Sequence, residues 1–90
     1  MQFEYDREKS EANKAKHGID FEEAQALWNF PIYEVPTYAG NDAQRSLCIG
    51  EIDGKTWTAI ITEREGRIRI ISVRRSRDYE TEAYCEYRNH

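Results

Sequence analysis

Two tight turns divide the C-terminal half of the chain into three short β-strands. Asp53-Gly54 and Glu65-Gly66 each separate two runs that are rich in β-branched and apolar residues. A two-residue Asp-Gly turn between such runs is a strong signal for a β-hairpin, because glycine tolerates the positive φ that the turn requires. We therefore expect an antiparallel series of strands at residues 45–52, 55–63 and 67–74.

The third of these strands carries more apolar residues than a half-buried strand needs. Ile68, Ile70, Ile71 and Val73 break the strict alternation of apolar and polar positions. Either both faces of this strand are partly covered, or a β-bulge lies near Ile70 and Ile71.

The N-terminal end predicts a short strand followed by a helix. Residues 2–5 alternate between polar and aromatic side chains, which is typical of a strand. Asp6 can cap a helix over residues 7–17, which contain many good helix formers. Gly18 can end this helix because glycine adopts a left-handed conformation without steric cost.

A second helix is expected to begin at Asp20. Asp20 and Glu23 have the spacing of a capping box, in which each side chain bonds the backbone of the other residue. Pro31 ends this helical region. A strong buried face is formed by Phe21, Ala24, Leu27 and Trp28.

The segment after this helix offers little regular structure. Residues 32–35 lie between Pro31 and Pro36, so they can form at best an edge strand. The glycine-containing stretch Tyr38–Gln44 predicts a loop. Asp78 can cap a last helix.

These elements predict an α+β fold in one domain that spans residues 1–90. We expect an antiparallel sheet of about four strands, two N-terminal helices and one C-terminal helix, in the order β-α-α-β-β-β-α. No apolar run approaches the roughly 18–20 residues that cross a bilayer, and the N-terminus does not resemble a signal peptide. Cys48 and Cys85 are far apart and outside any CxxC pair, which favours reduced thiols and a cytoplasmic location.

The charge is distributed unevenly along the chain. The formal net charge is −4, yet residues 64–77 carry six arginines and one acid. Proteins that coat nucleic acid non-specifically are usually basic overall. A local cationic block on an acidic body instead indicates a single site for an anion.

Three blocks of sequence resemble the BrnT toxin family, which lies within the RelE/ParE-like group of small ribonuclease folds. The first block is Asn13-x-x-x-His17-Gly18-x-x-Phe21-x-x-Ala24. The second is Arg45-x-x-x-Ile49-Gly50, followed by Gly54 and by Thr62-x-Arg64. The third is Ile68-Arg69-Ile70-Ile71-Ser72-Val73-Arg74-Arg75, followed by Glu82 and Tyr84.

The resemblance implies a toxin that arrests growth by cutting RNA. It also implies a BrnA-like ribbon-helix-helix antitoxin that covers the toxin in a 2:2 complex and binds promoter DNA. No metal or other cofactor is expected. A second interpretation keeps the same arginines in a non-enzymatic toxin that binds a protein target such as gyrase, and a third is a degenerate domain that only assembles with its antitoxin.

Metal-independent RNA cleavage needs a base for the 2′-hydroxyl, stabilisation of the phosphorane and an acid for the leaving oxygen. Arginine suits the second task, because its planar fork can bond two phosphate oxygens. The candidate catalytic residues are Arg64, Arg74, Arg75 and His17. The candidate substrate-binding residues are Lys14, Arg45, Arg67 and Arg69.

Each candidate also has a purely structural interpretation. Strand arginines often form surface ion pairs, and a histidine at a helix C-terminus interacts favourably with the helix dipole. Hairpin geometry places Arg45 and Arg67 near Arg64, but it does not bring Arg74 and Arg75 there. Arg74 and Arg75 are adjacent and point to opposite faces, so one of them can anchor the last helix through Glu80 or Glu82.

Overall fold

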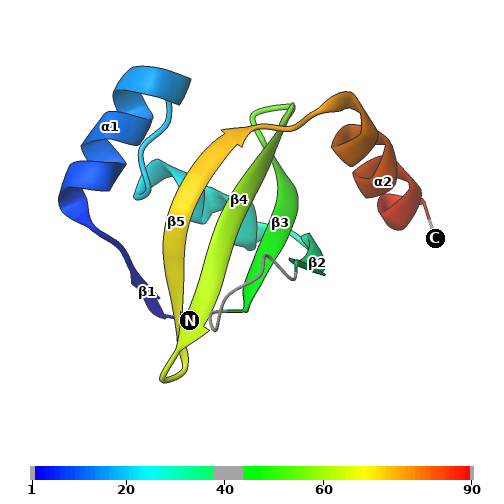
Figure 1. The fold of residues 1–90 in the computed structure, drawn as a ribbon. Helices are drawn as coiled ribbons and strands as arrows, with labels where there is room; N and C mark the ends of the chain where they lie inside the picture. Colours follow the sequence, from blue (N-terminus) through cyan, green and yellow to red (C-terminus); the bar gives the residue numbers. More distant parts are fainter. Residues whose placement is uncertain (1, 38–43, 90) are drawn as a thin grey trace.

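A computed structural model describes residues 2–37 and 44–89. The elements are β1 (Gln2–Glu4), α1 (Arg7–His17), the 3₁₀ helix η1 (Glu23–Asn29), β2 (Tyr33–Thr37), β3 (Arg45–Ile52), β4 (Lys55–Arg64), β5 (Arg67–Arg75) and α2 (Asp78–Arg88). The five strands form one sheet in the order β1-β5-β4-β3-β2 (Figure 1). None of the helices in this described part is long and apolar enough to cross a membrane.

The predicted sheet of about four antiparallel strands is wrong, although the α+β mixture of elements is present. The sheet is mixed, because β1 pairs with β5 in parallel, with Gln2 opposite Arg67 and Glu4 opposite Arg69. Sequence patterns detect strands but not their neighbours, and a strand remote in sequence can join either edge of a meander. The helical segment after β1 carries the chain to the opposite edge of the sheet, where β2 lies, and the antiparallel strands β2 to β5 lead back to β1, which β5 meets in parallel.

The predicted order β-α-α-β-β-β-α lacks one strand, and the second helix, expected to begin at Asp20, is the 3₁₀ helix η1, which begins at Glu23. Tyr33–Thr37 forms β2, which pairs antiparallel with β3. Pro36 lies inside this strand, opposite Ser46. An edge strand has a partner on only one side, so a residue without an N–H group is tolerated there. The loop predicted for Tyr38–Gln44 lies outside the described residues except for Gln44.

Both predicted turns are confirmed, and a bulge explains the broken alternation of the third predicted strand. Asp53, Gly54, Glu65 and Gly66 all have positive φ, between 50° and 79°, as the two-residue turn of a hairpin requires. Along β4 and β5 the register shifts between Ile60 and Ile61, whose partners are Ser72 and Ile70. Ile71 is thus the extra residue of a bulge, and the bulge allows both Ile70 and Val73 to face the core.

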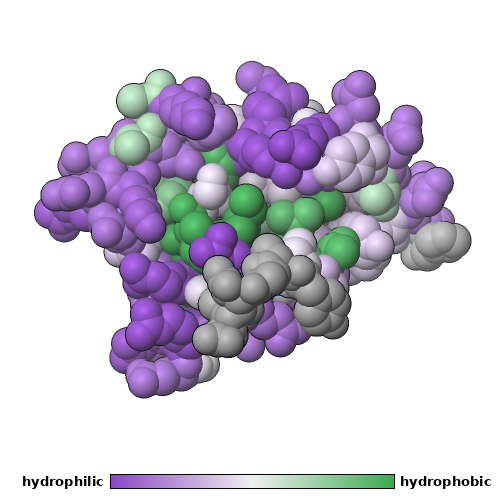
Figure 2. All heavy atoms as spheres, in the orientation of Figure 1, coloured by the Kyte–Doolittle hydropathy of each residue, from purple (hydrophilic) through white to green (hydrophobic). Residues whose placement is uncertain are grey.

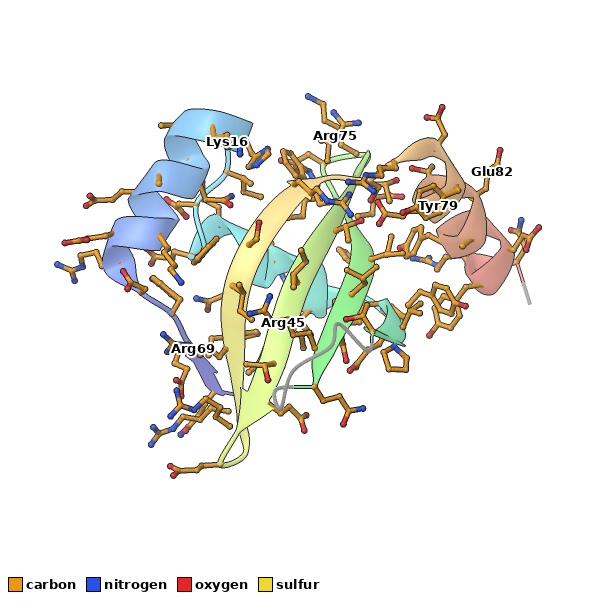
Figure 3. The ribbon with its side chains drawn as sticks, viewed as in Figure 1. Lys16, Arg45, Arg69, Arg75, Tyr79 and Glu82 are labelled. Atoms are coloured by element: carbon orange, nitrogen blue, oxygen red, sulfur yellow. The ribbon has the colours of Figure 1, made fainter. Side chains whose placement is uncertain are left out.

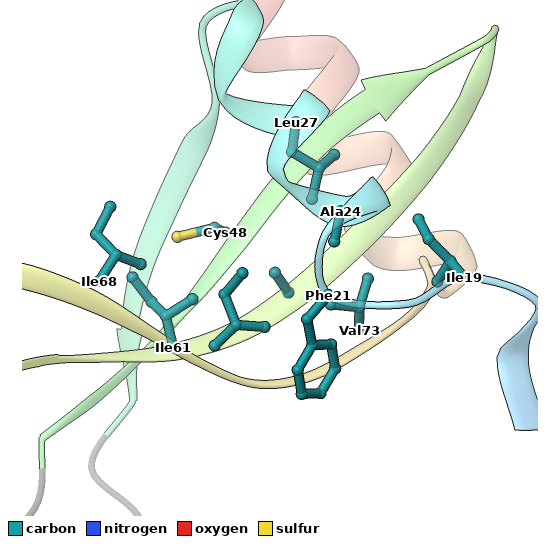
Figure 4. Close-up of a cluster of buried hydrophobic side chains, with 10 residues drawn as sticks. Ile19, Phe21, Ala24, Leu27, Cys48, Ile61, Ile68 and Val73 are labelled. Atoms are coloured by element: carbon teal, nitrogen blue, oxygen red, sulfur yellow. The ribbon is translucent and has the colours of Figure 1, made fainter. Parts of the chain in front are cut away.

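The hydrophobic core lies between one face of the sheet and the segment that contains η1 (Figure 4). From the helical side come Phe21, Ala24 and Leu27, all at most 1% exposed. The sheet contributes Cys48, Ala59, Ile61, Ile68, Ile70 and Val73. The reciprocal bonds predicted for Asp20 and Glu23 are present just before and at the start of η1: the Asp20 carboxylate accepts from the Glu23 N–H at 2.7 Å, and the Glu23 carboxylate accepts from the Asp20 N–H at 3.0 Å.

Asn13 fixes α1 against the edge of β5. Its Nδ2 donates to the carbonyl oxygens of Ile19 and Val73 at 2.8 and 2.9 Å, and its Oδ1 accepts from the Val73 N–H at 3.2 Å. The side chain is buried. Asn13 therefore completes backbone hydrogen bonding where β1 has ended and no further strand covers β5.

We expect Asn13→Ala to lower the free energy of unfolding by about 3 kcal/mol, because it leaves three buried backbone groups without partners. Chemical denaturation monitored by circular dichroism measures the change. Lys16→Ala is the control, since Lys16 is exposed on the same helix. A loss as small as that of the control would contradict the anchoring role.

The opposite face of the sheet is partly covered by α2. Glu80, only 2% exposed, accepts bonds from both terminal guanidinium nitrogens of Arg74 at 2.7 and 2.8 Å. It also accepts from the Thr58 hydroxyl at 3.1 Å and from the Arg77 N–H at 2.7 Å. The predicted anchoring of the last helix by one of the adjacent arginines is confirmed, with Arg74 and Glu80 as the pair.

The Glu80 anchor predicts a specific loss of stability in acid. Burial would raise the pKa of Glu80, but the bonds from Arg74, Arg77 and Thr58 outweigh it and lower the pKa. A carboxyl group with a lowered folded pKa stabilises the fold above its unfolded pKa of about 4.3, and this contribution is lost as the pH falls through the folded pKa. The difference in unfolding free energy between the wild type and Glu80→Gln should therefore narrow below about pH 4. Urea titrations at pH 7 and at lower pH test this, and a constant difference would disprove it.

Candidate active site

A surface cavity of about 790 Å³ brings together cationic side chains from four elements. They are Lys9 of α1, Arg45 at the start of β3, Arg64 at the end of β4, and Arg69 of β5. Figure 3 shows Arg45 over the middle strands and Arg69 near β1. No residue of α2 lines this cavity.

The register of the sheet explains why the arginines converge. Ser46 pairs with Ile61, which places Arg45 level with Thr62, and Thr62 in turn pairs with Arg69. Ile61 and Ile70 are buried in the core, so by alternation their neighbours point to the opposite face. The start of β3, the end of β4 and the start of β5 thus present their arginines side by side.

The surroundings of the cavity combine polar and apolar groups. The Thr62 hydroxyl donates to the Gln44 carbonyl oxygen at 3.0 Å, and the Thr37 hydroxyl donates to the Arg45 carbonyl oxygen at 3.1 Å. These bonds hold the backbone on which Arg45 is carried. Figure 2 shows apolar side chains gathered at the centre of this face, with hydrophilic side chains around them.

The arginines of the cavity differ in their ion pairs. Among the described residues, no carboxylate lies within 4.0 Å of the guanidinium of Arg45 or Arg64, and both residues are exposed. Arg69 donates to Glu4 at 2.9 Å. Glu34 and Glu63 also line the cavity. Arg45 and Arg64 are therefore open to an external anion, and two carboxylates share the cavity with them.

Arg67 pairs with Arg64 across β4 and β5. This confirms the position predicted from the turn between the two strands. The Arg67 guanidinium contacts Gln2 at 3.4 Å and Glu4 at 4.0 Å, so it turns toward β1. The expected neighbourhood of Arg45 and Arg64 is also confirmed, because both line the same cavity.

Arg74 and Arg75 lie at the other end of β5, on opposite faces. Arg74 is paired with Glu80, and the hydrogen bond to that carboxylate raises the pKa of Arg74. Arg75 stacks over the Trp57 ring at 5.4 Å and donates to the Thr56 carbonyl oxygen at 3.4 Å. The structure therefore separates these two arginines from the cavity.

Lys14 and His17 also lie away from the cavity. Lys14 donates to Glu23 at 2.7 Å, which raises the pKa of Lys14 and lowers that of Glu23. His17 is the last residue of α1, and Lys9 lies eight residues earlier, near its start. At 1.5 Å per residue the two are about 12 Å apart along the helix axis.

Sequence reasoning missed Lys9 and Glu4. Lys9 is one of several charged residues on an exposed helix, and Glu4 is the polar position of a short strand. Neither has a local signal, because each reaches the cavity or its arginines only through packing. The cationic block at residues 64–77 indicated Arg64 and Arg69, and the hairpin placed Arg45 beside Arg64, but neither signal indicated Lys9 or Glu4.

Neither cysteine lines this cavity. Both are free, and burial raises the pKa of the Cys48 thiol to about 12, with a further contribution from Glu34. In the described residues no group of three or more His, Cys, Asp or Glu side chains has the arrangement of a metal site.

Comparison with known proteins identifies the family. The family model described as "Ribonuclease toxin, BrnT, of type II toxin-antitoxin system" matches residues 5–80. No curated protein and no solved structure shows a significant match. The matched range contains Lys9, Arg45, Arg64 and Arg69, which line the cavity. The chain belongs to the BrnT family, the ribonuclease toxins of type II toxin–antitoxin systems.

Proposed function

We propose that the cavity binds the scissile phosphodiester of RNA and that the chain cleaves RNA there without a metal ion. One observation carries the proposal: four cationic side chains from four separate elements line a single cavity of an acidic protein. A guanidinium group can donate hydrogen bonds to two phosphate oxygens at once, and such bonds stabilise the negative charge that develops during the reaction.

The chemistry that fits this cavity is attack by the 2′-oxygen on the adjacent phosphorus. The 2′-hydroxyl loses its proton to a base, the phosphorane gains charge, and the bond to the 5′-oxygen breaks as that oxygen gains a proton. Arg45 and Arg64 stabilise the phosphorane. Glu34 or Glu63 can accept the first proton, and the Lys9 ammonium can supply the second.

Arg74 has a different role in this proposal, because its guanidinium is committed to Glu80 on α2. We assign it to anchoring that helix. Arg75 and His17 lie outside the cavity and take no part in the proposed reaction.

A type II toxin has an antitoxin partner. We propose that the partner is a BrnA-like ribbon-helix-helix protein, that the 2:2 complex binds promoter DNA, and that the toxin acts on cytoplasmic RNA. A cationic cavity on an acidic body favours an acidic segment of the antitoxin as its cover.

End-labelled RNA tests the activity directly. We expect cleavage that persists in excess EDTA and leaves 2′,3′-cyclic phosphate ends, because the mechanism uses the 2′-oxygen as nucleophile. A substrate with 2′-deoxyribose throughout should remain intact. Growth arrest by the chain together with intact RNA would favour the alternative, a toxin that binds a protein target. Loss of cleavage in EDTA would disprove the metal-independent mechanism.

A further inference from the structure

Glu4 is the one carboxylate that contacts an arginine of the cavity among the described ion pairs. Its Oε2 accepts from the Arg69 Nη1 at 2.9 Å, and its Oε1 lies 4.0 Å from the Arg67 Nη1. The parallel register of β1 and β5 places Glu4 directly opposite Arg69. The pairing of β1 with β5 therefore determines that these two side chains lie next to each other.

The residues on either side of Glu4 hold its strand in place. Phe3 packs against Trp28 with ring centroids 5.0 Å apart, and Tyr5 packs against Phe21 at 5.7 Å. Both aromatic side chains pack against the core. By alternation Glu4 points to the other face, so two core contacts fix the carboxylate that meets Arg69.

The ion pair contributes little to folding. The side chains of Arg69 and Glu4 are 32% and 27% exposed, and partly exposed pairs of this kind stabilise proteins by about 0–1 kcal/mol. The main effect of the pair is on the orientation of the Arg69 guanidinium. One guanidinium nitrogen is held by Glu4. Within residues 2–37 and 44–89 no other hydrogen bond occupies the guanidinium, so its remaining N–H donors can meet a phosphate.

We propose that Glu4 is a positioning residue for RNA cleavage: its carboxylate fixes the guanidinium of Arg69 in the orientation that receives the phosphodiester. This inference rests on the proposed function of the cavity. Because a fixed donor needs no reorganisation when charge develops, Glu4 contributes to turnover more than to RNA affinity. Its negative charge also opposes RNA binding, so its loss should not weaken binding.

A double-mutant cycle between Glu4 and Arg69 tests the inference. We expect Glu4→Ala to lower kcat about 10- to 100-fold without raising KM for a labelled RNA dodecamer. Glu4→Gln should recover part of kcat, because its amide oxygen can still accept from Arg69. In an Arg69→Ala background Glu4→Ala should have no further effect on kcat, because Glu4 acts through Arg69.

Controls separate positioning from a structural role. Glu11→Ala removes an exposed carboxylate from α1 and should leave kcat unchanged. The melting temperature of Glu4→Ala should stay close to that of the wild type. An unchanged kcat in Glu4→Ala, an equal loss in the Arg69→Ala background, or a raised KM would each overturn the inference.

The same double-mutant cycle, measured on binding affinity, tests the inference without depending on RNA cleavage. A single-stranded DNA dodecamer cannot be cleaved through a 2′-oxygen, and its affinity should increase in Glu4→Ala by a larger factor when Arg69 is present than when it is absent. Equal factors overturn the inference. If Arg64→Ala cleaves RNA like the wild type, the proposed function of the cavity is disproved. If Arg64→Ala is inactive but the effects of Glu4→Ala and Arg69→Ala on kcat are additive, only the inference about Glu4 is disproved.

Discussion

Replacing Arg64 by alanine is expected to lower kcat for RNA cleavage by roughly 100- to 1,000-fold, the usual cost of losing one group that stabilises a developing negative charge. Arg64 ends β4 inside the cavity and has no carboxylate within 4.0 Å among the described residues. Its removal therefore takes away a free guanidinium without leaving an unpaired acid. Single-turnover cleavage of labelled RNA measures the effect, and growth arrest should be lost in parallel.

Two further variants make this test specific. Arg64→Lys keeps the charge but loses the planar fork, so an activity between those of the wild type and Arg64→Ala is expected. Arg7→Ala removes an exposed arginine from the first turn of α1 and should retain full activity. The fold should be intact in all three variants. Full cleavage by Arg64→Ala would remove Arg64 from the site.

Glu80→Ala should destabilise the fold more than Asn13→Ala does, lowering the free energy of unfolding by about 3–5 kcal/mol. The substitution leaves the Arg74 guanidinium, whose side chain is only 19% exposed, without a counter-charge. It also deprives the Thr58 hydroxyl and the Arg77 N–H of their acceptor. For a chain of 90 residues the melting temperature, measured by circular dichroism, should fall by more than about 12 °C.

Replacing both members of the pair provides the matched control. In Arg74→Met/Glu80→Met no charge is left buried, so part of the lost stability should return. Glu82→Ala, an exposed position on the same helix, should change the stability by at most about 0.5 kcal/mol. If Glu80→Ala were as mild as Glu82→Ala, α2 would be held by other contacts.

Features that depend on near neighbours in the chain could be predicted. The turns at Asp53-Gly54 and Glu65-Gly66 and the reciprocal bonds of Asp20 and Glu23 follow from local chemistry. The broken alternation at Ile70 and Ile71 left two interpretations open, and the structure shows the bulge. The hairpin then determines that Arg45 and Arg67 lie near Arg64. Each of these predictions needed only the alternation of a strand, the φ preference of a glycine or the spacing of a cap.

Features that depend on the order of the strands could not be predicted. The parallel position of β1, the fifth strand β2, and the approach of Lys9 to the arginines are set by packing between distant segments. For the adjacent Arg74 and Arg75, the sequence indicated opposite faces. Only the structure showed that Arg74 meets Glu80 and that Arg75 stacks on Trp57.

The sequence by itself determined the local elements, the cationic block and the family resemblance, because these depend on residue types and short spacings. The tertiary structure decided which arginines share a cavity, which is committed to α2, and that Glu4 stands beside Arg69. The physical reason is that a side chain's ion pair depends on which strand lies next to its own. The order of the strands is determined by how the whole hydrophobic core is buried, and not by the residues adjacent in the chain.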